Sequence, residues 1–109
     1  ILPPKSNNNI TSVYHLFPLR INPITEEQRN KIIENLSKKE IATNVHYIPM
    51  PALTLFKNLG YKAEEYPEAM DAFSREITLP LYPQLTNQQV EYIVRNLVEE
   101  YYSVLNKNK

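Results

Sequence analysis

Apolar residues are gathered in three short runs of this chain and are spaced at every third and fourth position elsewhere. The runs cover residues 13–21, 43–48 and 76–81, and their apolar, aromatic and β-branched composition predicts β-strands. Pro18 lies inside the first run and has no N–H to donate, which favours a sheet edge or a bulge there. The runs therefore predict a small sheet of about three strands.

Two capping-box sequences mark the starts of the longer predicted helices. Thr25-Glu-Glu-Gln28 precedes a helix that is expected to end near Lys39, and Thr86-Asn-Gln-Gln89 precedes a final helix with a broad apolar stripe. Pro51 and Pro67 are each expected to open a shorter helix, because the first helical position has no intrahelical use for an N–H.

This order of elements, β-α-β-(α-α)-β-α, predicts an α+β fold. We expect a small antiparallel or mixed sheet of about three strands with helices packed on one face. Residues 13–105 are expected to form the domain, residues 1–12 a linker, and residues 106–109 a frayed tail. Because the sequence begins on apolar residues without Met, we expect it to start inside a longer polypeptide.

Composition narrows the range of possible partners. The chain has 109 residues, with 12 basic and 12 acidic side chains and no Cys. A nucleic-acid-binding protein needs a basic face, and none is visible. The lack of Cys excludes a disulfide framework and thiolate metal sites, and two histidines alone do not make a zinc site. No apolar run approaches the ~18 residues of a membrane span. We expect a cytoplasmic protein without metal, nucleic acid or membrane as partner.

The candidate binding residues lie where the second predicted strand ends. His46 and Tyr47 lead directly into the rigid corner Pro49-Met-Pro51, and loops at strand ends often hold ligands. We therefore take His46, Tyr47 and Pro49 as candidate ligand contacts. A hydrogen bond that anchors the loop is an equal alternative for His46. His15 is expected to be a buried core histidine. The chain shows no complete catalytic apparatus, since a single glycine cannot form a phosphate-binding loop.

Four segments follow one another in a specific order along the chain. They are Tyr14-His-Leu-Phe-Pro-Leu-Arg20, Ile41-Ala-Thr-Asn-Val-His-Tyr-Ile-Pro-Met50, Leu59-Gly-Tyr61 and Ile77-Thr-Leu-Pro-Leu-Tyr-Pro-Gln-Leu-Thr86. Together they resemble the C-terminal small domain of the DegT/DnrJ/EryC1/StrS family of pyridoxal-phosphate-dependent sugar aminotransferases. Many members carry a second His after the His-Tyr-x-Pro motif. This chain has Pro51 there, so a substrate preference that depends on that His does not carry over.

The resemblance implies an enzyme that transfers an amino group from glutamate or glutamine to a nucleotide-linked keto sugar, for cell-surface polysaccharide or related amino-sugar biosynthesis. Pyridoxal phosphate, its Schiff-base lysine and the acid at the pyridinium nitrogen are implied to belong to an N-terminal domain that this sequence lacks. The fragment is then expected to hold no catalytic or cofactor-binding residue and to be inactive alone. It would wall the substrate cleft, with His46, Tyr47 and Pro49 on the nucleotide-sugar, in an enzyme that is typically a homodimer.

Two alternatives stay open at this point. The chain is either a stand-alone α+β module that binds a ligand without catalysis, or a dimerisation domain. In the second case the uncovered sheet face, with Tyr101 and Tyr102 of the last helix, would pack on a partner. What precedes Ile1 in the polypeptide separates these alternatives from the enzyme.

Overall fold

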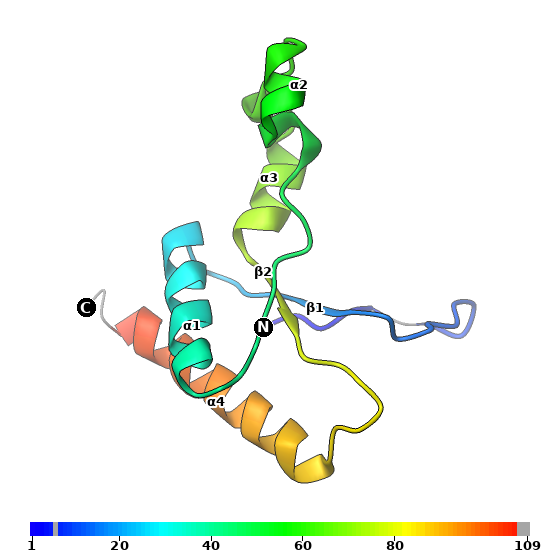
Figure 1. The fold of residues 1–109 in the computed structure, drawn as a ribbon, viewed down its shortest axis with the longest axis vertical. Helices are drawn as coiled ribbons and strands as arrows, with labels where there is room; N and C mark the ends of the chain where they lie inside the picture. Colours follow the sequence, from blue (N-terminus) through cyan, green and yellow to red (C-terminus); the bar gives the residue numbers. More distant parts are fainter. Residues whose placement is uncertain (6, 107–109) are drawn as a thin grey trace.

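The computed structural model describes residues 1–5 and 7–106 and has the predicted α+β architecture. Two antiparallel strands lie beside two long helices, and the remaining short elements form an arm that projects from this body (Figure 1). The body consists of β1 (Phe17–Arg20), α1 (Glu26–Lys38), β2 (Glu76–Leu79) and α4 (Asn87–Asn106). The arm consists of η1 (Met50–Ala52), α2 (Thr54–Asn58), η2 (Ala63–Glu65) and α3 (Pro67–Ser74).

The two faces of the sheet differ in character. Leu19 pairs with Ile77 across the strands, and both side chains are buried among apolar residues of α1 and α4. Because side chains alternate along a strand, the neighbouring positions point to the other face. That second face carries Pro18, Arg20, Glu76 and Thr78. One face therefore builds the core, and the other presents polar groups.

The expectation of a third strand at residues 43–48 is wrong, because the sheet of the described residues has two strands. Asn44 makes only an isolated bridge to Thr78, with N–H···O distances of 3.1 and 2.8 Å in the two directions. Two residues later, the N–H of His46 donates to the side-chain carboxylate of Glu76 at 2.8 Å. A side chain thus takes the place of a ladder carbonyl, and regular pairing stops.

Both predicted capping boxes are present. Thr25 Oγ1 accepts a hydrogen bond from the N–H of Gln28 at 3.2 Å, and Gln28 Oε1 accepts one from the N–H of Thr25 at 2.9 Å. Thr86 and Gln89 repeat the arrangement at 3.2 and 2.9 Å. These reciprocal bonds satisfy backbone donors that the first helical turn leaves open, so both helices begin where the sequence predicted.

The apolar stripe of α4 is only partly covered. Ile93 and Leu97 of the predicted stripe are buried in the core, and Val104, which was not predicted, is buried with them. A second row at i, i+4 spacing along the same helix is 37% to 57% exposed and consists of Val90, Val94, Val98 and Tyr102. The stripe is therefore wider than the surface that this sheet and α1 offer to it.

The start of the chain is paired with β1. Leu2 and Arg20 exchange two backbone hydrogen bonds of 2.7 and 3.0 Å, which holds residues 2–5 beside the strand.

His15 is exposed in a bend before β1, so the expectation of a buried histidine is wrong. The physical reason is that pairing starts only at Phe17. Of the expected frayed tail, Asn106 ends α4 and residues 107–109 lie outside the described residues.

Candidate functional site

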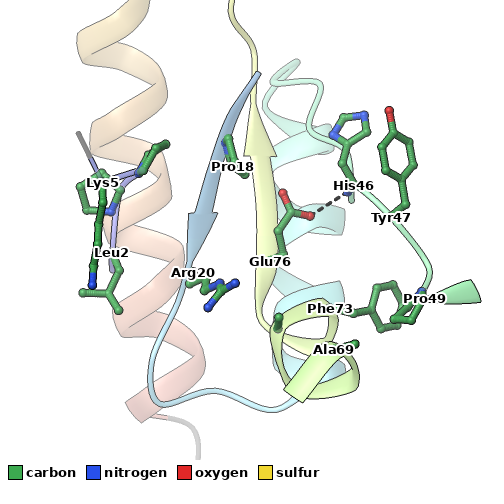
Figure 2. Close-up of a pocket in the computed structure, with 13 residues that line it drawn as sticks. Leu2, Lys5, Pro18, Arg20, His46, Tyr47, Pro49, Ala69, Phe73 and Glu76 are labelled. Atoms are coloured by element: carbon green, nitrogen blue, oxygen red, sulfur yellow. Dashed lines mark hydrogen bonds between the residues drawn. The ribbon is translucent and has the colours of Figure 1, made fainter. Parts of the chain in front are cut away.

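A cleft with a volume of about 760 Å³ opens on the polar face of the sheet (Figure 2). Its walls come from the N-terminal segment, both strands, the loop after Asn44 and α3. His46, Tyr47 and Pro49, the three candidate binding residues, all line it. The structure therefore brings them together on one wall, opposite the N-terminal segment (Figure 2). Their contact with a ligand stays a prediction.

His46 is attached to β2 through both its backbone and its ring. Its N–H donates to Glu76 Oε2 at 2.8 Å, and its Nδ1 lies 2.9 Å from Thr78 Oγ1 (the first bond is dashed in Figure 2). The Thr78 hydroxyl also hydrogen-bonds to Glu76 Oε1. The Nδ1 atom of His46 thus anchors the loop to β2, as the loop-anchoring alternative predicted. Its Nε2 makes no hydrogen bond within the part of the chain that the structure describes.

Tyr47 and Pro49 shape the rim of the cleft. The Tyr47 side chain is 71% exposed and meets the His46 ring edge to face, with the two ring centroids 4.7 Å apart. Pro49 is half-buried and immediately precedes η1. Its fixed φ and the adjacent Pro51 limit the conformations of the loop, which lowers the ordering cost of binding.

A buried arginine supports the cleft from below, and sequence reasoning missed it. Arg29 of α1 is 2% exposed, and its guanidinium donates from Nη1 to the carbonyl oxygen of Glu76 at 3.2 Å. It also lies under the ring of Phe73, a cleft residue of α3, with 4.9 Å between Cζ and the ring centroid. Burial lowers the pKa of Arg29, while the charges of Glu26 and Glu76 act to raise it. In the sequence, Arg29 precedes Ile32 by three positions and Leu36 by seven, which places it on the buried face of the helix and could have indicated its burial.

The cleft contains charges of both signs. Arg20 and Glu76 are cross-strand neighbours on the same face of the sheet, and Lys5 lies on the wall opposite His46 (Figure 2). Two cations in a concave site attract anions, while Glu76 and the ring of His46 offer hydrogen-bonding groups. Glu76 and Thr78 were missed at the sequence level, although polar residues alternate with apolar ones there. The arrangement suits the recognition of a ligand that is both anionic and rich in hydroxyl groups.

Residues 1–5 and 7–106 offer neither a metal site nor a membrane span. No group of three or more His, Asp or Glu side chains in these residues is placed to hold a metal ion. No helix among them has both the length and the apolar character needed to cross a membrane.

Comparison with known sequences places this chain among aminotransferases. A sequence model described as the DegT/DnrJ/EryC1/StrS aminotransferase family matches residues 1–98. The chain is 36% identical over 96 residues to the uncharacterized protein MJ1066 of Methanocaldococcus jannaschii, a match that covers 86% of this chain and 25% of that protein. It is 33% identical over 79 residues to a GDP-perosamine synthase of Escherichia coli O157:H7, covering 72% of this chain and 21% of the relative.

The fold also matches a solved structure. The putative sugar aminotransferase Spr1654 from Streptococcus pneumoniae, in its PMP-form, superposes with a TM-score of 0.95 and 39% sequence identity. The match covers 98% of this chain and 27% of that protein. The chain therefore spans about a quarter of the length of the relatives that it matches.

Proposed function

The chain belongs to the DegT/DnrJ/EryC1/StrS aminotransferase family, and from this premise we propose that it forms the substrate-cleft wall of a pyridoxal-phosphate-dependent sugar aminotransferase. The intact enzyme would transfer an amino group from glutamate or glutamine to a nucleotide-linked keto sugar. The name of the GDP-perosamine synthase supports a nucleotide-linked sugar, and that of a spore coat polysaccharide biosynthesis protein of Bacillus subtilis supports a role in polysaccharide biosynthesis. The product would serve cell-surface polysaccharide or related amino-sugar biosynthesis.

Pyridoxal phosphate, when bound, supplies an electron sink for the carbon that carries the amino group. The described residues do not by themselves fit this cofactor. Lys5 lines the cleft but is exposed, and Lys31 and Lys38 both pair with Glu34 at the surface. Lys39 forms an ion pair with Glu100 at 2.8 Å. No described lysine other than Lys5 lines the cleft, and the family resemblance implies a Schiff-base lysine in another domain. We therefore assign this lysine to a part of the enzyme outside this sequence, and the isolated chain is expected to be inactive.

The observation that carries the proposal is the joint position of the loop residues and the cations around one cleft. Arg20 and Lys5 would attract the phosphates of the nucleotide. His46 and Tyr47 would bond to the sugar, and Pro49 would hold the loop in place. Family membership alone does not justify these roles. For Arg20, His46, Tyr47 and Pro49 they are supported by the position of these residues in both the family motif and the cleft, and for Lys5 by its place in the cleft alone.

The test separates the two half-reactions of transamination in the intact enzyme. Absorbance of the bound cofactor would report the half-reaction with glutamate and the half-reaction with the keto sugar separately, each in a single turnover. GDP- and UDP-linked keto sugars are suitable probes, because one relative is a GDP-perosamine synthase and another, from Helicobacter pylori, is a UDP-4-amino-4,6-dideoxy-N-acetyl-beta-L-altrosamine transaminase. His46→Ala and Tyr47→Phe should slow only the sugar half-reaction. Loss of one hydrogen bond of ~0.5–1.5 kcal/mol predicts a change of about 2- to 13-fold.

Tyr82→Phe is the matched control. Tyr82 is 48% exposed and does not line this cleft, so both half-reactions should keep their rates. If His46→Ala and Tyr47→Phe retain the wild-type sugar half-reaction, the loop is structural and the proposed contact is wrong. If they slow the glutamate half-reaction equally, their role is not specific to the sugar.

The stand-alone binding or dimerisation module remains the alternative function. The exposed row on α4, which ends at Tyr102, favours an apolar partner surface there. Such a module would exist as a complete protein without the cofactor.

A lysine-dependent imine absorbance in the isolated chain near neutral pH would contradict the assignment of the cofactor site to another part of the enzyme.

A further inference from the structure

Two side chains on the cleft face of β2 and one from the loop beside it form a continuous hydrogen-bonded relay. Thr78 Oγ1 lies in the middle, bonded to Glu76 Oε1 on one side and 2.9 Å from His46 Nδ1 on the other. Glu76 Oε2 accepts a hydrogen bond from the backbone N–H of His46 at 2.8 Å, so Glu76 contacts His46 directly as well as through Thr78. Glu76 is 6% exposed and Thr78 is 5% exposed, so water does not compete freely for these groups.

The directions of these bonds follow from the proton count. A hydroxyl has one proton to donate, whereas an ionised carboxylate can only accept. Thr78 must therefore give its proton to Glu76 and accept from the other side. The donor on that side is the His46 ring, and Nδ1 must carry a hydrogen. In a neutral imidazole the second nitrogen, Nε2, is then left with a lone pair.

Glu76 has hydrogen-bond donors at both carboxylate oxygens and two arginines nearby. The guanidinium of Arg29 lies on the core side of β2 and bonds to the carbonyl oxygen of Glu76 itself. Arg20 is the cross-strand neighbour of Glu76 on the cleft face. Both carboxylate oxygens face donors, the N–H of His46 and the hydroxyl of Thr78. A carboxylate, which only accepts hydrogen bonds, matches both of these donors.

We propose that this relay fixes His46 as the Nδ1–H tautomer and makes its free Nε2 a hydrogen-bond acceptor for the ligand. Nε2 belongs to a cleft residue and has no partner among the described residues. An acceptor recognises a group that brings a proton, such as a sugar hydroxyl. It does not bind a phosphate oxygen, which itself needs a donor. The inference rests on the proposed function and assigns His46 to the sugar, leaving the phosphates to Arg20 and Lys5.

Glu76 and Thr78 are thus positioning residues that act through His46. The substitution Glu76→Gln tests this with almost no change of shape. The amide NH₂ of glutamine would donate to Thr78 Oγ1, and the amide oxygen would keep the N–H of His46. Thr78 would then donate its own proton to Nδ1, and the ring proton would move to Nε2. One change in β2 is therefore expected to invert the hydrogen-bonding character of His46.

The experiment is nitrogen NMR of the intact protein with isotope-labelled histidine, without any ligand. Couplings between ring nitrogens and ring carbon protons identify the tautomer, and the signal lost in His46→Gln assigns the residue. Spectra are recorded at rising pH until the ring nitrogen shifts no longer change, so that the neutral imidazole is the form observed. The wild type should carry its proton on Nδ1, and Glu76→Gln should carry it on Nε2. A wild-type proton on Nε2, or an unchanged tautomer in Glu76→Gln, would overturn the relay.

A second pair of variants covers the case in which Glu76→Gln does not fold. Thr78→Val keeps the shape of the side chain but breaks the relay, so both tautomers should appear, and Thr78→Ser should restore the Nδ1–H form. A Thr78→Val spectrum identical to the wild type would contradict the relay. The half-reaction kinetics are independent of these spectra. Unchanged sugar kinetics in His46→Ala, with the expected tautomers, would remove the sugar contact and leave the relay standing.

Discussion

Replacement of Arg29 by methionine tests whether the buried guanidinium supports the floor of the cleft. Methionine keeps much of the side-chain length in the core but removes every polar contact. The guanidinium donates to the Glu76 carbonyl oxygen at 3.2 Å and lies 3.3 Å from Glu26 Oε1. The Phe73 ring centroid is 4.9 Å from Cζ. The substitution therefore loosens the link from α1 to β2 and α3.

The expected magnitude is the difference between these contacts and the cost of burying the guanidinium. A charged hydrogen bond to a buried carbonyl contributes ~1.5–3 kcal/mol. The pair with Glu26, whose side chain is 48% exposed, adds at most ~1 kcal/mol, and the contact with Phe73 adds ~0.5–2 kcal/mol. Against this, Arg29 Nε is buried without a partner, which costs ~1–3 kcal/mol. With the middle of each range, the net loss on substitution is about 2 kcal/mol, and ~1 kcal/mol on either side of it corresponds to about 5- to 150-fold.

Amide hydrogen exchange in the intact protein measures this loss locally. The amides of β2 should exchange about 5- to 150-fold faster in Arg29→Met. Lys31→Met on the exposed side of α1 is the control, and it should change these rates by no more than about twofold, as for other surface substitutions. Unchanged exchange in Arg29→Met would refute the reasoning. Slower exchange would mean that the burial cost exceeds the value of all three contacts.

Two further predictions concern stability. Leu36→Ala should lower the free energy of unfolding by ~2–5 kcal/mol, because Leu36 is fully buried. The control Leu55→Ala, at a site that is 64% exposed, should change it by less than ~0.5 kcal/mol. Equal effects of the two variants in urea unfolding would contradict the core assignment. Hydrogen bonds from Lys31 and Lys38 lower the pKa of Glu34 from 4.5 to about 2. The stabilising contribution of Glu34 is therefore present above pH 4.5 and is lost as the pH falls toward about 2. Glu34→Gln should flatten the dependence of the unfolding free energy on pH in that window; the effect should be small because the pair is exposed, and smaller still in salt. A profile parallel to that of the wild type would argue against the effect.

The features that were predicted correctly depend on neighbours in the sequence. The capping boxes at Thr25 and Thr86 involve residues three positions apart, so the sequence contains everything that forms them. The strand expected at 43–48 depended instead on a partner strand. Its apolar pattern was suitable, but the N–H of His46 found a carboxylate 30 positions away in place of a ladder carbonyl. A pattern of side chains does not report where backbone groups find their partners.

The same reasoning explains what was found and missed in the candidate site. His46, Tyr47 and Pro49 form one contiguous motif, so their joint position on the cleft wall follows from local sequence. Their supporting residues come from elsewhere in the chain. Arg29 and Glu76, for example, are 47 positions apart. Only the tertiary packing of α1 against β2 brings these two together, and a single sequence gives no measure of that distance.

The location of the cofactor lysine tests the central claim most directly. Reduction of the intact enzyme with borohydride fixes pyridoxal phosphate to its lysine, and peptide mapping then identifies the residue. If this chain is the substrate-cleft wall, the pyridoxyl label will lie on a peptide outside the 109 residues. A label on Lys5, the lysine that lines the cleft, or on any other lysine of this sequence would contradict the claim.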